Sequence, residues 1–158
     1  MQGVSHEEDR SLAARPLAVA TPALANEARI EGRGGVFWGD GYTQDVYGVA
    51  MGYDFDLGTS AFAGVEVSGD KVADTGTKVA WGFTGRAGAK LGEASKVYLN
   101  GGYTTEPCDV CDGSWHAGAG VQQGFGQNLY GKVEYRHYFT QNNNPDANAV
   151  MVGLGVRF

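Results

Sequence analysis

Side chains along most of this chain alternate, residue by residue, between apolar types and polar or small types. The final segment, VMVGLGVRF (150–158), places valine, leucine and phenylalanine on one parity and glycine, methionine and arginine on the other. Successive side chains of a β-strand point to opposite faces, so a period of two predicts a strand with one apolar face. This pattern constrains the fold more than any other feature of the chain.

Seven earlier segments show the same alternation, and turn-forming residues separate them. No stretch has the period of an amphipathic helix, and no apolar run approaches the roughly 18 residues that a membrane-spanning helix needs. Glycine is abundant, with 26 of 158 residues, and it lies within the alternating segments. We therefore expect an all-β fold with strands at 28–38, 46–57, 60–68, 78–91, 96–104, 114–123, 129–139 and 150–158.

The connections between these strands alternate in length. Short turns are expected at 56–59, 92–95 and 124–128, and longer polar loops at 39–45, 69–77, 105–113 and 140–148. An even number of strands with alternating short turns and long loops is typical of outer-membrane barrels. The sequence thus predicts an eight-stranded antiparallel up-and-down transmembrane β-barrel, with its long loops extracellular and both termini periplasmic.

Charged residues of both signs gather on the polar parity, near the middle of their strands. Burying an isolated ion costs several kcal/mol, whereas charges of opposite sign at similar height can pair in a closed interior. Eight strands enclose a space about wide enough for side chains to fill. We therefore expect a plugged interior with a charge network of Glu31, Arg33, Glu66, Arg86, Glu134 and Arg136.

Aromatic residues mark both ends of the apolar faces, and all three tryptophans lie at the loop-side ends. Two aromatic belts around an aliphatic band are typical of proteins at the two interfaces of a bilayer. The predicted outer belt contains Trp38, Tyr47, Trp81, Tyr103 and Trp115, and the inner belt contains Phe55 and Phe158.

Residues 1–26 are expected to form a leader and residues 27–158 the barrel. The stretch LAVATPALA (17–25) resembles the end of a secretory signal, with Ala23–Leu24–Ala25 as the cleavage site. The opening MQGVSHEEDR is too acidic for the start of such a signal. The leader is therefore interpreted as a remnant or a misannotated signal peptide, and a disordered leader is the alternative.

Cys108 and Cys111, in EPCDVCDG, are the two cysteines of the chain. Export favours a disulfide between them. A metal site that adds Asp109, Asp112 and His116, or a redox motif, are the alternatives, and both are weaker because a single C-x-x-C carries little information.

The stretch LYGKVEYRHYF (129–139), followed by a polar loop and VMVGLGVRF, resembles the end of the eight-stranded outer-membrane β-barrel superfamily, which includes opacity-type and porin-family proteins. The resemblance covers residues 28–158. It implies a Gram-negative outer-membrane protein whose terminal aromatic residue, Phe158, is the recognition signal for the barrel-assembly machinery.

The expected role is structural or adhesion-like, with membrane lipid around the barrel and an unknown surface partner at loops 39–45, 69–77, 105–113 and 140–148. No catalytic, cofactor or metal site is expected, and the net charge of −6 argues against nucleic acid. Three alternatives remain: a narrow channel for solutes or ions, a lipid-modifying enzyme that uses His116 beside Ser114, and a soluble ligand-binding barrel with its apolar face inward.

Overall fold

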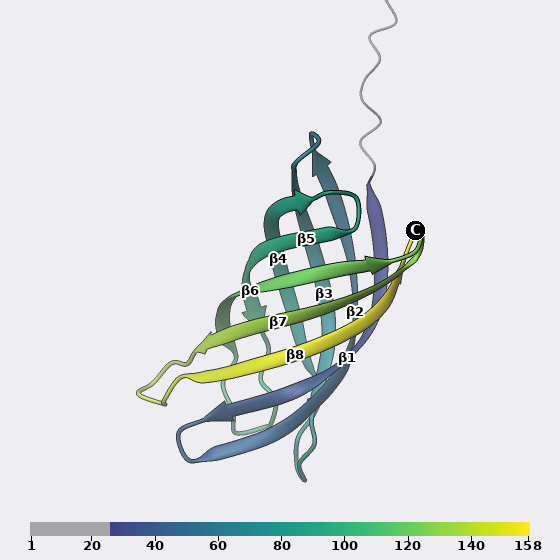
Figure 1. The fold of residues 1–158 in the computed structure, drawn as a ribbon. Coiled ribbons are helices and arrows are strands. Elements are labelled where there is room, and N and C mark those ends of the chain that lie inside the picture. Colours follow the sequence, from purple (N-terminus) through teal and green to yellow (C-terminus); the bar gives the residue numbers. More distant parts are fainter. Residues whose placement is uncertain (1–25) are drawn as a thin grey trace, which may run out of the picture.

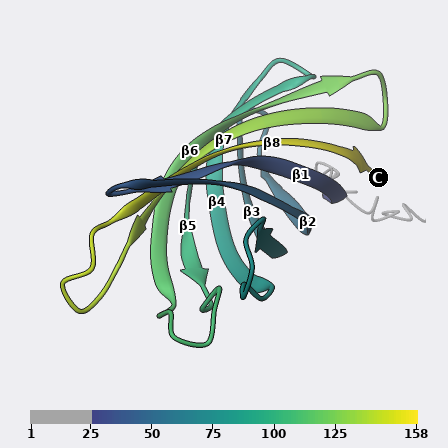
Figure 2. The same ribbon diagram turned by 90° about the horizontal axis from the view of Figure 1, so that it is seen from below.

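The computed structural model describes residues 26–158, which form a closed barrel of eight antiparallel strands (Figures 1 and 2). The predicted fold class is confirmed. The predicted leader falls almost entirely outside the described residues. The strands are β1 (Glu27–Gly39), β2 (Tyr42–Leu57), β3 (Ala61–Val72), β4 (Ala80–Leu91), β5 (Ser95–Thr104), β6 (Ser114–Phe125), β7 (Leu129–Phe139) and β8 (Ala147–Arg157).

Pairing between the first and last strands closes the barrel. β1 and β8 run antiparallel, in register from Arg29 opposite Arg157 to Trp38 opposite Asn148. The backbones of Ala28 and Phe158 extend this pairing with reciprocal N–H···O hydrogen bonds of 3.0 and 2.9 Å. Closure leaves no strand edge with unpaired backbone groups, which is a requirement for strands in lipid.

The predicted loop at 39–45 is wrong. β1 and β2 continue through most of it, pairing as far as Gly39 opposite Tyr42, and only Asp40 and Gly41 connect them. Gly41, the second residue of this turn, has a φ of +78°, a left-handed conformation that glycine adopts without strain. The polar composition of this segment suggested a loop. A strand that extends beyond the apolar band needs no apolar face, so its composition can be as polar as that of a loop.

Other strand ends also differ from the predicted bounds, by up to four residues. β3 runs on to Val72, β4 begins at Ala80, and β8 begins at Ala147, so the loops cover residues 73–79 and 140–146. The loop at 105–113 has the predicted bounds. At the opposite end of the barrel three-residue turns cover 58–60, 92–94 and 126–128, and each opens on a glycine with φ between +72° and +82°.

The apolar parity of each strand points away from the barrel axis. Val49, Leu99 and Val152 are among its most exposed side chains, and Leu99 is 70% exposed. The opposite parity, which carries the charges, is buried inside. The alternative of a soluble barrel with an apolar interior is therefore wrong. Among residues 26–158, no helix is long and apolar enough to cross a membrane.

Replacing Leu99 with arginine tests the orientation of the apolar face. Leu99 lies near the middle of β5, so Leu99→Arg should place a charge deep in lipid and destabilise the folded barrel by about 2–4 kcal/mol. Urea titration of the folded fraction in phospholipid vesicles measures this. Val110→Arg is the control, because Val110 lies in a loop and is 96% exposed. Equal effects of the two changes would contradict an outward lipid face.

Candidate functional site

The interior of the barrel is filled with charged side chains. Six cations and four carboxylates there are each more than nine-tenths buried, and Asp70 and Glu27 bring the carboxylates to six. The structure places all six charges expected from the sequence inside. The buried cations are Arg29, Arg33, Arg86, Lys96, Lys132 and Arg136, and the buried carboxylates are Glu31, Asp54, Glu66 and Glu134.

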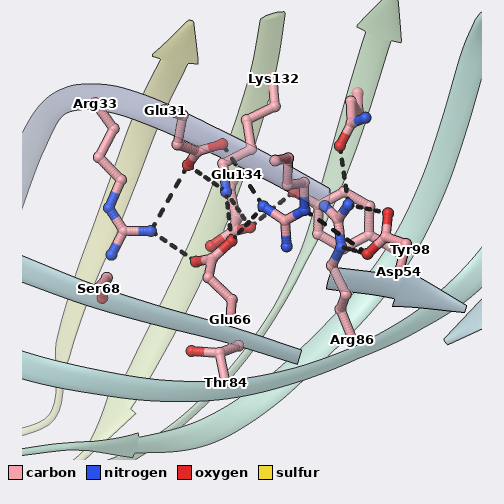
Figure 3. Close-up of polar contacts among 12 residues, drawn as sticks. Glu31, Arg33, Asp54, Glu66, Ser68, Thr84, Arg86, Tyr98, Lys132 and Glu134 are labelled. Atoms are coloured by element: carbon pink, nitrogen blue, oxygen red, sulfur yellow. Dashed lines mark hydrogen bonds and ion pairs between the residues drawn. The ribbon is translucent and has the colours of Figure 1, made fainter. Parts of the chain in front are cut away.

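Glu66, on β3, stands at the centre of this network (Figure 3). Its Oε1 accepts hydrogen bonds from Arg33 at 2.8 Å and Arg136 at 3.0 Å. Its Oε2 accepts from Arg29 at 2.8 Å and Lys132 at 3.1 Å. These four cations come from two strands, β1 and β7, which both pair with β8, so one carboxylate on β3 links three strands that are far apart in the sequence.

Two more carboxylates balance the cations around Glu66. Glu31 lies 2.6 Å from Lys132 Nζ and accepts a hydrogen bond of 2.6 Å from the Tyr130 hydroxyl. Glu134 accepts one of 2.7 Å from the Tyr98 hydroxyl and another from Arg136. Every buried charge at mid-height therefore has at least one partner of opposite charge, as burial requires.

A second cluster lies toward the end with the short turns. Asp54 accepts hydrogen bonds of 2.9 Å from Arg86 Nε and from Lys96 Nζ. The Arg86 guanidinium also lies 4.7 Å from the ring centre of Tyr98 and 5.3 Å from that of Phe62, which adds cation–π attraction. Figure 3 shows the Arg86 guanidinium beside the Asp54 carboxylate, joined by dashed lines.

Glycines on the inner face leave room for these long side chains. A Cβ atom at Gly52 would lie 2.5 Å from Arg29 Nη2, and one at Gly120 would lie 2.5 Å from the Tyr98 ring. Real Cβ atoms essentially never come that close to another heavy atom. The high glycine content therefore has a packing role in a narrow barrel with a charged interior.

Much of the network was not predicted from the sequence. Arg29, Asp54 and Lys132 share the parity of the predicted charges, so alternation alone could have included them. Lys96 was left out because it lies at a strand end. The two buried tyrosines, Tyr98 and Tyr130, were not recognised as carboxylate partners because nothing in their local sequence marks a partner on a distant strand.

The predicted belt residues lie at the two ends of the outer surface. Tyr103 and Trp115 face each other across β5 and β6, with ring centres 5.3 Å apart. Phe55 packs against Tyr53 at the other end, 4.9 Å between centres. That these ends meet the two bilayer interfaces stays a prediction. Residues of the predicted belts are Trp38, Tyr47, Trp81, Tyr103, Trp115, Phe55 and Phe158.

The Sγ atoms of Cys108 and Cys111 lie at disulfide-bonding distance in the β5–β6 loop, with Cα atoms 5.0 Å apart. The redox state of the pair stays a prediction. Within residues 26–158 no group of three or more potential metal ligands comes together.

His116 belongs to the interior polar network. Its ring nitrogens lie 3.0 Å from Thr84 Oγ1 and 3.1 Å from Thr104 Oγ1. No hydrogen bond joins it to Ser114 among the described residues, so the nucleophile–base pair considered in the sequence is not formed.

A cavity of about 770 Å³ opens at the end that carries the longer loops. Its walls come from the loop-side ends of the strands and from all three of these loops. Asp70 lines the part of the cavity nearest the ion-pair network, and Arg33 Nε donates to that carboxylate at 2.8 Å. The ion-pair network thus forms the floor of the cavity and separates it from the opposite end of the barrel.

Hydrogen bonds hold together the loops around the mouth of the cavity. Lys78 contacts the Glu106 carboxylate at 2.9 Å, which raises the pKa of Lys78, and its backbone N–H donates to Pro107 O at 2.8 Å. The backbone N–H of Thr140 donates to the Asp146 carboxylate at 3.1 Å and lowers the pKa of Asp146. Lys78 and Asp146 are therefore both charged at neutral pH.

Comparison with solved structures identifies barrels of the same architecture. Neisserial surface protein A has a TM-score of 0.56 at 11% identity, covering 84% of this chain and 97% of that one. Ail, the attachment invasion locus protein of Yersinia pestis, has a TM-score of 0.56 at 14% identity, with 84% and 98% coverage. The chain has the fold of the eight-stranded outer-membrane β-barrels. The resemblance expected from the sequence is confirmed.

Sequence comparison agrees with this assignment. The 25 kDa outer-membrane immunogenic protein of Brucella ovis is 30% identical over a 140-residue alignment, and the match covers 80% of this chain. The chain spans 63% of the length of that relative. No family model matches the chain. Together the comparisons indicate a protein of the bacterial outer membrane.

Neutralising Glu66 tests the importance of the network. Glu66→Gln leaves four buried cations without their shared carboxylate and should destabilise the barrel by about 3–5 kcal/mol, measured by urea titration in detergent. Glu106→Gln is the matched control, because Glu106 pairs with Lys78 at the exposed rim, where solvent screens the pair and its contribution to stability is small. A loss at Glu66 no larger than that at Glu106 would show that the interior does not depend on this carboxylate.

Proposed function

We propose that this chain is a structural and surface-interaction protein of the outer membrane, and that its longer loops contact a partner outside the cell. The observation that supports this proposal most is the filled interior. Ion pairs occupy the barrel at mid-height, so the surface available to a macromolecule is that of the loops. The filled interior also weighs against the alternative of an open channel.

The orientation follows from the same proposal. The three longer loops and the β1–β2 turn face outward from the cell, whereas the three-residue turns, the start of β1 and the end of β8 face the periplasm. Membrane lipid surrounds the apolar outer face, and the assembly machinery recognises the strand that ends in Phe158. The alternative of a lipid-modifying enzyme receives no support from His116, which lies among threonines.

Charge indicates which partner suits these loops. Seven carboxylates and two lysines lie at the loop end: Asp40, Asp45, Asp74, Glu106, Asp109, Asp112 and Asp146, with Lys71 and Lys78. Such a surface attracts a basic partner and repels a polyanion. Ail of Yersinia pestis, a barrel that is 15% identical with a TM-score of 0.55, was solved in complex with the heparin analogue sucrose octasulfate, which is a polyanion.

Binding of charged polymers tests the proposal. The full chain in uncharged detergent should bind poly-lysine and not sucrose octasulfate. The combined change of Glu106→Gln, Asp109→Asn and Asp112→Asn should weaken poly-lysine binding about tenfold, because three charges leave the rim. Fluorescence anisotropy of labelled poly-lysine measures this.

The control removes a charge from the opposite end, where Glu93 lies exposed in a three-residue turn. Glu93→Gln should leave poly-lysine binding unchanged. Binding of sucrose octasulfate, or an equal loss in the control, would contradict a basic partner at the loops.

A further inference from the structure

The cavity at the loop end has the size of a small-molecule site. Its volume of about 770 Å³ falls within the range of roughly 300–1,000 Å³ that is usual for ligand pockets. It lies inside the ring of loops, with the Arg33–Asp70 pair at the end nearest the ion-pair network. A molecule that enters from outside would therefore be held between the strands and the loops rather than pass through the barrel.

One wall of this cavity is aromatic and apolar. The Phe37 ring packs against Tyr138, with centres 5.5 Å apart, and against Tyr42, with centres 5.9 Å apart. Val46 and Met151 line the cavity beside these rings. Such a wall favours an apolar body by burial, and the ring faces also attract a cation by cation–π interaction.

The charges that line the cavity are all negative. Four aspartates line it, and no lysine, arginine or histidine does so among the described residues. Two of the four are compensated, because Asp70 pairs with Arg33 and Asp109 lies 3.3 Å from Lys78 Nζ. The remaining two are Asp74 and Asp112.

Asp74 and Asp112 bind only neutral donors. Gln44 Nε2 donates to Asp74 at 2.7 Å, and Asn142 Nδ2 donates to Asp112 at 3.2 Å. Neither carboxylate has a cationic side chain within ion-pair distance among residues 26–158. Two negative charges without a counter-ion therefore face a cavity that has an aromatic wall.

We propose that this cavity binds an organic cation with an apolar body, a protonated or quaternary amine on an aromatic or aliphatic frame. The apolar body packs against Phe37, Tyr42 and Tyr138, and the charged nitrogen lies beside Asp74 and Asp112. This site differs from that of the proposed surface partner, because a small molecule fills the interior of the loop ring whereas a macromolecule contacts its rim; Asp74 and Asp112 contribute charge to both.

Two probes of matched shape and opposite charge test the proposal. Naphthylmethyl-trimethylammonium should bind the full chain at a single saturable site, measured by titration calorimetry in maltoside micelles with empty micelles subtracted. Naphthylmethanesulfonate, which has the same ring system and a negative charge, should bind at least about tenfold more weakly. Tetramethylammonium, which lacks the apolar body, should also bind more weakly.

Two pairs of substitutions separate the site from the general charge of the loop end. Asp74→Asn with Asp112→Asn should weaken binding of the aromatic cation about tenfold and reduce its preference over the sulfonate. Asp40→Asn with Asp45→Asn removes the same charge from the same end, outside the cavity lining, and should change binding little. Tyr42→Ala should weaken both ring probes, because Tyr42 belongs to the wall that both contact.

All of these positions are exposed or lie in loops, and an unboiled gel confirms for each variant that the barrel is folded. The proposal is overturned if the aromatic cation does not saturate a site, if the sulfonate binds as tightly, or if the two double variants weaken binding equally. Loss of poly-lysine binding alone would affect only the proposed surface partner.

Discussion

The contact of four cations with the Glu66 carboxylate is the interaction on which the rest of the barrel depends. Glu66 lies on β3, and its partners lie on β1 and β7, so the contact joins opposite parts of the wall. Buried ions are stable only when they are paired and hydrogen-bonded. Because the network fills the interior, the apolar side chains of each strand point to the outer surface.

The same network divides the barrel into functional parts. It blocks the interior at mid-height. On the side of the longer loops, these loops and the adjoining strand ends enclose a cavity with an aromatic wall and two carboxylates that have no cationic partner. A fold of this kind specifies little about function by itself, because barrels of the same architecture carry different loops. The chemistry of the chain is therefore expected at its loop end, where the sequence is most acidic.

The period of two was sufficient to predict the strands, their number and the face each residue occupies, because side-chain direction in a strand depends only on position. It could not give partners. Arg136 reaches Glu66, seventy positions away, through closure and stagger of the barrel, which no local pattern encodes. Polar composition also failed at 42–45, where the hairpin of β1 and β2 extends beyond the apolar band. The cavity was not foreseen because it forms between loops whose positions the sequence does not define.

Gel mobility of the unboiled chain is the most direct test of a barrel with charges inside and an apolar surface outside. The chain is refolded in parallel in detergent and in plain buffer, and each sample is run with and without boiling. A barrel of this kind gives a shifted, folded band before boiling in the detergent sample alone. A folded band from plain buffer would contradict an apolar outer surface, because a barrel with Leu99 and Val49 exposed to water would not stay folded and dispersed without detergent.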